Sequence, residues 1–348
     1  MFLSFSLPLI VFIFIVAAGA VWFAGVQLSN TIDVIDSRFD LGQAFGGLIF
    51  LAIATNLPEI TIVVTASLAH NIGIAIGNIL GGIAIQTVVL VILDGFGLGR
   101  KSALSYQAAS LQIVLEGVLV ISILVISIMG TQLPKSIIFA RLAPGDLLIV
   151  ATWFIGLILI NKARGGLPWH NNGRAPDIIS PKKSIAQKKK ESWRTGHLLF
   201  VFIFSAVITL AAGVILEETS SAIATYIGWS GVLFGSTILA AVTALPEVST
   251  GLAAVKMGDY TLAFSDIFGG NAFLPVLFLP ATILSGQSIL PQAQKTDIYL
   301  ASLGALLTAV YIYGLIFRPK RQFFYLGIDS LIVLVMYIIG IVGLFTIS

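Results

Sequence analysis

The stretch TNLPE at residues 55–59 decides the fold of this chain, because it returns as TALPE at residues 243–247. The offset of 188 residues holds over 47–84 and 235–272, which align without a gap and are identical at 13 of 38 positions. Chance matches between apolar segments would involve leucine, alanine and glycine, but not a repeated Pro-Glu pair. The chain therefore contains an internal repeat, and in membrane transporters such paired interrupted segments point to the substrate site.

The composition places the chain in a lipid bilayer. Of its 348 residues, 57% are hydrophobic and only 10% are charged, against about 25% charged residues in a soluble domain. A net charge of +3 is too small for this length to indicate nucleic-acid binding. Since the chain has no cysteine, disulfides, thiolate metal sites and cysteine nucleophiles are excluded.

Ten apolar segments are long enough to cross a membrane, because about 20 such residues span a hydrocarbon core of about 30 Å. We therefore expect an all-α integral membrane protein with about ten transmembrane helices. The expected spans are 5–28, 41–68, 72–97, 104–129, 142–161, 197–216, 229–255, 260–286, 297–317 and 323–347.

The spans divide into two halves around a polar stretch. We expect a first five-helix repeat at 1–161, a basic cytoplasmic linker at 162–196 and a second five-helix repeat at 197–348. Five crossings in the first half invert the second, so the repeats have inverted topology. Sixteen of the 19 lysines and arginines fall in loops on one side. The positive-inside rule places that side in the cytoplasm and both termini outside it, and by analogy we expect the plasma membrane.

The two repeated glutamates, Glu59 and Glu247, lie inside apolar segments. A carboxylate in the middle of a membrane helix costs a few kcal/mol, so its presence indicates a functional site. The proline before each glutamate removes a backbone donor and should break the helix near Thr55 or Thr243. Hydroxyl, carboxylate and freed carbonyl oxygens would then face one cavity.

A second pair of polar residues, Asn78 and Asp266, follows the glutamates by 19 positions. A short turn lies between, so each helical hairpin would bring its two polar residues to one depth. A site made only of oxygen atoms suits hard cations such as Ca²⁺. The two glutamates would balance one divalent ion, and Asp266 would supply a third charge for a proton or a monovalent ion.

This pattern resembles the alpha repeats of the calcium/cation antiporter superfamily, which includes the sodium/calcium exchangers. The resemblance implies a secondary transporter rather than an enzyme, which moves Ca²⁺ or a similar cation in exchange for Na⁺ or H⁺. Alternating access would occur at a carboxylate site near the membrane midplane, without a prosthetic group, and the partners would be inorganic cations and the lipid bilayer. By this resemblance the candidate cation ligands are Glu59, Glu247, Asp266, Asn78, Thr55, Thr243 and Asn56.

The chain departs from the family pattern after each repeated threonine, where a serine is usual. Asn56 and Ala244 occupy these positions, so two hydroxyl groups are lost. Such side chains help to form Na⁺ sites in the exchangers, which weakens the expectation of Na⁺ coupling. Proton coupling through Asp266 or a glutamate is easier to retain, because desolvation favours the protonated carboxyl. The coupling ion and the oligomeric state stay open.

Two other functions use paired acids in a membrane. An enzyme would need a nucleophile, a histidine pair or a phosphate-binding arginine at membrane depth, and the mid-membrane segments have none. A cation channel is disfavoured because the inverted repeat with two prolyl hairpins favours one occluded site.

Glu116 lies in the fourth span as either a ligand or proton relay, or as a carboxyl bonded to a neighbouring helix. Glu217 and Glu218 lie at the outer end of the sixth span, where we expect a solvated cap; the alternative is that they recruit external cations.

Overall fold

A computed structural model describes residues 5–39, 52–98, 102–108, 110–164, 166 and 192–347. The first half contains the helices α1 (Leu7–Phe39), α3 (Leu57–Leu68), α4 (Ile72–Gly97), α5 (Leu104–Ala108), α6 (Leu111–Thr131) and α7 (Pro144–Arg164). The second half begins with α9 (Thr195–Ile227), α10 (Gly231–Phe234), the π-helical η3 (Gly235–Leu239), α11 (Ala240–Thr243), α12 (Leu245–Met257) and α13 (Tyr260–Phe273). It ends with η4 (Leu274–Leu277), α14 (Phe278–Ser285), η5 (Leu290–Gln292), α15 (Lys295–Phe317), the strands β1 (Gln322–Phe323) and β2 (Leu326–Gly327), and α16 (Ile328–Ile347).

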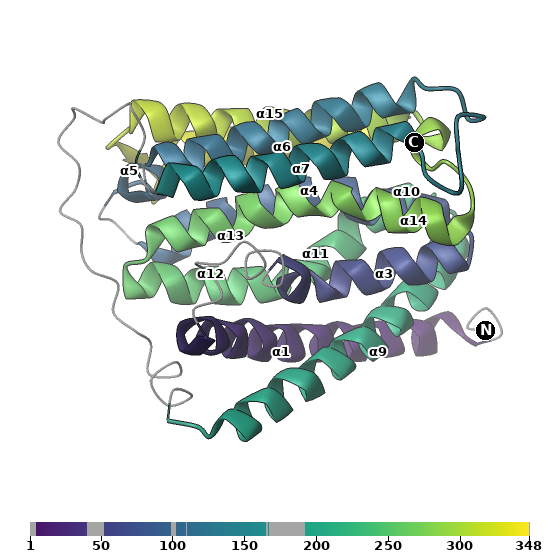
Figure 1. Cartoon of the computed structure of the whole chain (residues 1–348), viewed down its shortest axis with the longest axis horizontal. Coiled ribbons are helices and arrows are strands. Elements are labelled where there is room, and N and C mark those ends of the chain that lie inside the picture. Colours follow the sequence, from purple (N-terminus) through teal and green to yellow (C-terminus); the bar gives the residue numbers. More distant parts are fainter. Residues whose placement is uncertain are drawn as a thin grey trace.

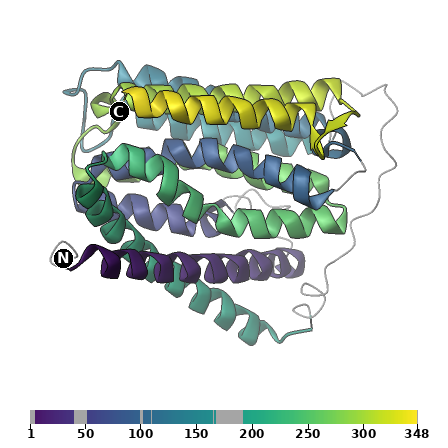
Figure 2. The ribbon, with the colours of Figure 1, turned by 180° about the vertical axis from the view of Figure 1, so that it is seen from behind.

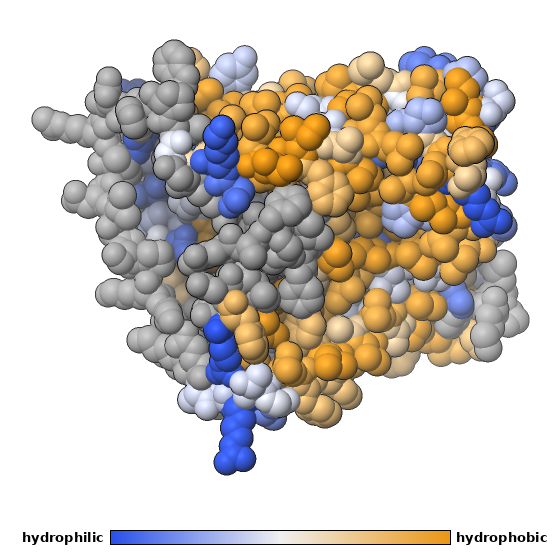
Figure 3. Space-filling model, viewed as in Figure 1, coloured by the Kyte–Doolittle hydropathy of each residue, from blue (hydrophilic) through white to orange (hydrophobic). Residues whose placement is uncertain are grey.

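The helices confirm the all-α membrane architecture. Eight described helical segments are long and apolar enough to cross a membrane, and the bent pair 231–243 and 245–257 can form a ninth span. Of the second expected span, 41–68, the structure describes only the part from residue 52 onward. Large apolar side chains such as Phe23, Phe200 and Ile339 are 71%, 64% and 64% exposed. Hydrophobic residues cover most of the described part of the face shown in Figure 3, as expected for a surface in contact with lipid.

The helices form three layers (Figures 1 and 2). One outer layer contains α6, α7, α15 and α16, and α6 packs against both α7 and α15. The other outer layer consists of α1 and α9, which pack along each other. Between them lie α3, α4, α12, α13 and α14, the helices that contain the repeated motifs. The middle layer is therefore covered on both sides.

The two motif helices α3 and α12 begin near the middle of the molecule and run toward opposite ends (Figure 1). The turn between α3 and α4 lies at the end where α1 begins and α16 ends, and we call this end the α3–α4 face. The turn between α12 and α13 lies at the other end, the α12–α13 face (Figures 1 and 2). The opposite directions of α3 and α12 agree with inverted topology.

The repeated prolines break their helices where the sequence predicts. Asn56 and Ala244, each two residues before the proline, are turn residues that separate two helical segments. In the second half the axes on either side of Ala244 differ by 41°. Because proline has no N–H, the carbonyl four residues earlier receives no helical hydrogen bond from it. The break therefore exposes backbone oxygen beside each glutamate.

Glycines of α4 allow a close contact with the other half of the chain. A Cβ on Gly77 would lie 2.6 Å from the carbonyl oxygen of Val232, and Gly81 would clash with Ser236 in η3. The π-helical turn lies at this crossing and ends four residues before Thr243, the last residue of α11. Single π-helical turns occur often at functional sites. The contact fixes the helix that leads to the second glutamate.

The solvated cap expected at Glu217 and Glu218 is wrong. Helix α9 continues to Ile227 instead of ending near residue 216. Glu217 is fully buried and Glu218 is half-buried. The reason is a contact that is distant in sequence: Asn71 Nδ2 donates a hydrogen bond to Glu217 Oε1 at 2.8 Å. This bond and the packing of α3 on α9 remove the carboxyl from solvent.

Candidate functional site

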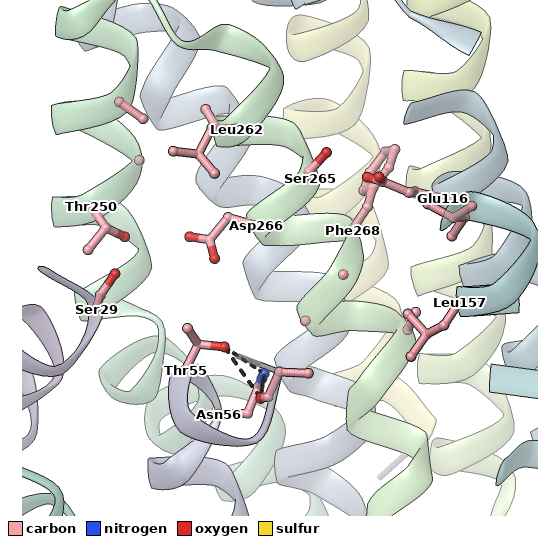
Figure 4. Close-up of a pocket in the computed structure, with 18 of the residues that line it drawn as sticks. Ser29, Thr55, Asn56, Glu116, Leu157, Thr250, Leu262, Ser265, Asp266 and Phe268 are labelled. Atoms are coloured by element: carbon pink, nitrogen blue, oxygen red, sulfur yellow. Dashed lines mark hydrogen bonds between the residues drawn. The ribbon is translucent and has the colours of Figure 1, made fainter. Parts of the chain in front are cut away.

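A cavity of about 240 Å³ lies among α1, α6, α7, α12 and α13. Its polar lining consists of Ser29, Thr55, Asn56, Glu116, Thr250, Ser265 and Asp266 (Figure 4). The lining extends from Leu262, near the beginning of α13, to Ala272 in the middle layer. The cavity therefore lies on the side of the glutamates that is nearer the α12–α13 face.

Asp266 is the acid that points into this cavity from α13, and it is partly exposed there. Thr250 of α12 faces its carboxyl, and the Thr55 hydroxyl points toward the same space (Figure 4). Thr250 is three residues after Glu247, so both lie on one face of α12. The sequence prediction omitted Thr250, although this spacing from the glutamate could have identified it.

The two repeated glutamates lie in the first turns of α3 and α12. Glu59 is completely buried and its carboxyl faces Thr243, yet neither oxygen makes a hydrogen bond of normal geometry to any described residue. Glu247 Oε2 is likewise buried without a bonding partner among the described residues. Glu59 and Asp266 both lie close enough to Glu247 to interact with it electrostatically. The fold thus brings together three acids from three helices.

Buried carboxyl oxygens without hydrogen bonds are costly, so they indicate that another group satisfies them. Within the described part of the chain, no three His, Cys, Asp or Glu side chains are arranged to hold a metal ion on their own. A cation between Glu59 and Glu247 would therefore need additional ligands that are neutral. Hydroxyl, amide and backbone carbonyl oxygens, such as those beside the two helix breaks, are the ligands that Ca²⁺ accepts.

Thr55 and Asn56 form the helix break on the first side. Asn56 Nδ2 donates to the carbonyl oxygen of Ala52 at 2.8 Å and to Thr55 Oγ1 at 3.3 Å. The Asn56 amide therefore stabilises the interrupted backbone. Its Oδ1 lies toward α13, where a Cβ on Gly270 would approach it to 3.5 Å. At Ala244, the equivalent position, no side-chain amide is present.

Asn78 lies in α4, fully buried, and neither its Oδ1 nor its Nδ2 has a hydrogen-bond partner among the described residues. Asn271 of α13 is also fully buried. Its Nδ2 donates to Thr87 Oγ1 of α4 at 3.1 Å, whereas its Oδ1 has no partner in the described segments. Thr243 donates to the carbonyl oxygen of Ala240 at 3.2 Å. The middle layer thus contains several polar oxygens besides the carboxylates.

Glu116 reaches the same cavity from α6. It is 6% exposed, and Gln112 Nε2 donates to its Oε1 at 3.0 Å. This hydrogen bond comes from the preceding turn of the same helix rather than from a neighbouring helix. Ser29 of α1 also lines the cavity. The sequence prediction omitted Ser29, which lies just beyond the expected end of the first span.

Comparison with known proteins gives a consistent result. The family model described as "Sodium/calcium exchanger protein" matches residues 9–161 and 197–346. The chain is 25% identical to the inner membrane protein YrbG of Escherichia coli (strain K12) over 312 residues, which cover 88% of this chain and 90% of the relative. It is 26% identical to the putative antiporter CaxA of Alkalimonas amylolytica over 270 residues, covering 76% and 78% of the two chains.

The fold also matches a solved structure. The crystal structure of the H⁺/Ca²⁺ exchanger CAX superimposes with a TM-score of 0.68 and 14% sequence identity. The match covers 97% of this chain and 82% of that one. At this identity the likeness concerns the fold alone, and it agrees with the region matched by the family model.

Proposed function

The chain belongs to the sodium/calcium exchanger protein family, and from this premise we propose that it exchanges Ca²⁺, or a similar hard cation, for H⁺ or Na⁺. It is a secondary transporter of cations rather than an enzyme. The observation that most strongly supports Ca²⁺ as cargo is the convergence of Glu59 and Glu247. Their buried oxygens have no hydrogen-bond partners in the described part of the chain, and a divalent cation would satisfy them.

The proposed cation site combines these two carboxylates with neutral oxygens. Thr55 and Thr243 precede the glutamates by one helical turn, and Asn56, Asn78 and Asp266 provide further oxygens around them. An all-oxygen site of this kind suits Ca²⁺ better than a transition metal. In this proposal Asp266 binds the metal cation and the coupling ion in turn, because it adjoins the glutamates and also lines the cavity.

We favour H⁺ as the coupling ion. At the two positions after the threonines Asn56 has an amide in place of a hydroxyl and Ala244 has no side-chain oxygen, so Na⁺ would find fewer hard oxygen ligands there. A proton needs only a carboxylate that can release it. The similar exchanger CAX is described as an H⁺/Ca²⁺ exchanger, whereas the family name includes sodium. Na⁺ coupling is therefore the second candidate.

Transport would proceed by alternating access between two five-helix halves, 1–161 and 197–348, joined by the linker 162–196. The antiparallel courses of α3 and α12 support this arrangement (Figure 1). With the basic loops in the cytoplasm, the α12–α13 face would be cytoplasmic and both termini would lie outside. The plasma membrane is the proposed location.

The test uses the full-length protein in proteoliposomes loaded with labelled Ca²⁺. We expect Ca²⁺ flux when an opposing pH gradient is imposed, and little flux with an opposing Na⁺ gradient at constant pH. Glu59→Gln and Glu247→Gln should each abolish the flux, whereas Glu218→Gln, a change in a half-buried acid outside the site, should leave it intact. Unimpaired exchange in either site variant would contradict the assigned ligands. Flux that needs no counter-gradient and does not saturate would indicate a channel.

A further inference from the structure

The two long helices α1 and α9 correspond residue by residue. Helix α1 begins at Leu7 and α9 at Thr195, and both have 33 residues, so the offset of 188 found in the motifs also holds here. Ser29 of α1 therefore corresponds to Glu217 of α9. A serine and a glutamate occupy equivalent places in the inverted halves.

Ser29 shows the surroundings of this helix position on the open side of the molecule, the side that contains the cavity lined by Asp266. It lines the cavity together with Thr55, Thr250 and Asp266, and its hydroxyl is directed toward Thr250 and Asp266 in Figure 4. In Figure 4 Asp266 of α13 lies on the Ser29 side of the cavity, whereas the second acid of its lining, Glu116 of α6, lies on the opposite side.

Around the equivalent place near the α3–α4 face, which we call the closed side, the helices pack more closely, although Ile74 also lines a separate polar cavity on that face. Leu262 in the wall of the cavity is 42% exposed, whereas its counterpart Ile74 is 3% exposed. Ile62 is completely buried, whereas its counterpart Thr250 is partly exposed. The two halves therefore have different conformations around equivalent residues, as expected when access is open on one face only.

Glu217 lies within this closed region with part of its carboxyl unsatisfied. Asn71 Nδ2 donates to Oε1 at 2.8 Å, while Oε2 is buried without a partner among the described residues. Ser220 Oγ, one turn further along α9, is buried and likewise has no partner in the described ranges. Asn71 also lines a polar cavity of about 560 Å³ with His70, Gln287 and Gln292 on the α3–α4 face. Asn71 therefore contacts both the buried carboxylate and this cavity.

Two pairs of equivalent positions, 29 with 217 and 78 with 266, each have an acid in one member only. On the open side α1 contributes Ser29 and α13 contributes Asp266, while the counterparts on the closed side are Glu217 and Asn78. At these two pairs of positions each side thus has one carboxylate and one neutral polar group, but on different helices; Glu116, which also lines the open cavity, has Gly304 at its equivalent position. Without Glu217, an asparagine at position 78 would leave the closed side with no carboxylate at these positions.

We propose that Glu217 is the cation-binding acid of the cavity that opens on the α3–α4 face in the opposite state. There Glu217 binds the incoming metal cation, as Asp266 does on the α12–α13 face. This inference rests on the proposed exchange by alternating access. In the closed state Asn71 holds the carboxyl, and opening replaces that amide with the hydrated cation. A carboxylate is the ligand type that a hard cation prefers.

The test measures Ca²⁺ half-saturation separately on each face of oriented proteoliposomes. Glu217→Gln should raise the half-saturating concentration about tenfold on the α3–α4 face and less than about twofold on the other, because one attractive charge is lost from one cavity. Asp266→Asn should show the reverse sidedness. Glu218→Gln, the neighbouring half-buried acid, should change neither value.

A double variant separates this role from a structural one. Glu217→Ser combined with Asn78→Asp gives the closed side the arrangement of the open side, and it should restore affinity on the α3–α4 face to within about threefold of the original. Equal effects of Glu217→Gln on both faces, no effect, or failure of the double variant to restore affinity would each overturn the inference. If the unsubstituted protein shows no exchange at all, the proposed function fails instead.

A chemical measurement tests the same site if Glu217→Gln does not fold. Dicyclohexylcarbodiimide modifies carboxyls in apolar surroundings, and the labelled peptide can be quantified by mass spectrometry in the unsubstituted protein. We expect Glu217 to be labelled, and Ca²⁺ added on the α3–α4 face to reduce that labelling severalfold. Labelling that is indifferent to Ca²⁺ on this face would contradict cation binding at Glu217.

Discussion

Gly81 of α4 lies directly against Ser236 of η3, with no space between them for a Cβ atom. This contact joins a helix of the first half to a helix of the second, close to Asn78 and to the break before Glu247. Because backbone rather than a flexible side chain fills the space, neither helix can adjust without moving the candidate site. Packing between the halves therefore fixes the positions of the polar residues.

Replacing this glycine should destabilise the protein. We expect Gly81→Ala to cost about 1–3 kcal/mol, the usual penalty of overpacking, and to lower the thermal unfolding temperature in detergent. Gly19→Ala in α1 is the control, since no described atom lies within 4 Å of a Cβ there and alanine favours the helix. An unfolding temperature for Gly81→Ala equal to that of the control would contradict the close contact.

Shortening the site carboxylates should impair cation affinity while the charge is retained. Glu59→Asp withdraws the carboxylate by one methylene group from its place beside Thr243. Since Ca²⁺ ligands lie within a narrow range of about 2.3–2.6 Å, we expect the half-saturating Ca²⁺ concentration to rise about tenfold or more. Flux assays over a range of Ca²⁺ concentrations measure this, with Glu218→Asp as the matched change. Equal affinities in the two variants would argue against a ligand role for Glu59.

Straightening the second motif helix should reduce transport more than stability. Pro246→Ala restores an N–H that can donate to the carbonyl of Val242, so the 41° bend should decrease. We expect a lower exchange rate with an unfolding temperature close to the original. Pro144→Ala is the control, because proline at the first position of α7 replaces an N–H that has no helical partner. A bend without functional importance would leave both variants equally active.

Asp94 should be a structural residue. Its Oδ1 accepts from Leu104 N at 2.7 Å and its Oδ2 from Gly327 N at 2.6 Å, so it fastens α4 to α5 and to the hairpin before α16. Asp94→Ala leaves two buried donors unsatisfied, each at about 1–3 kcal/mol. We expect a marked fall in the unfolding temperature, with less effect from Asp259→Asn, which retains an N-cap acceptor for α13. Comparable losses in the two variants would show that the Asp94 bonds contribute little.

The sequence was sufficient for features that depend on local chemistry and repetition. The repeated Pro-Glu pair predicted helix breaks that the structure has at Asn56 and Ala244, because proline acts on its own helix. Most spans were predicted because lipid demands long apolar helices. The roles assigned to the seven candidate ligands are still predictions, although the fold brings Glu59, Glu247 and Asp266 together.

Features that depend on distant contacts could not be read from the chain. The burial of Glu217 depends on Asn71, which is 146 residues away in sequence. From the sequence alone, an apolar span is expected to end at such an acid. The π-helical turn at Gly235–Leu239 lies at a crossing with glycines of α4. Ser29 acquires significance only because α1 lies beside α12. In each case the deciding partner belongs to another helix.

The length of α1 and α9 makes the thickness of the surrounding membrane relevant to the working cycle. A helix of 33 residues measures about 50 Å along its axis, well beyond a hydrocarbon core of about 30 Å. Such a helix lowers hydrophobic mismatch by tilting, and α9 already crosses α1 obliquely (Figure 1). Lipids with longer acyl chains would favour more upright helices and shorter chains more inclined ones. Bilayer composition thereby becomes a determinant of how these two helices lie against the motif helices.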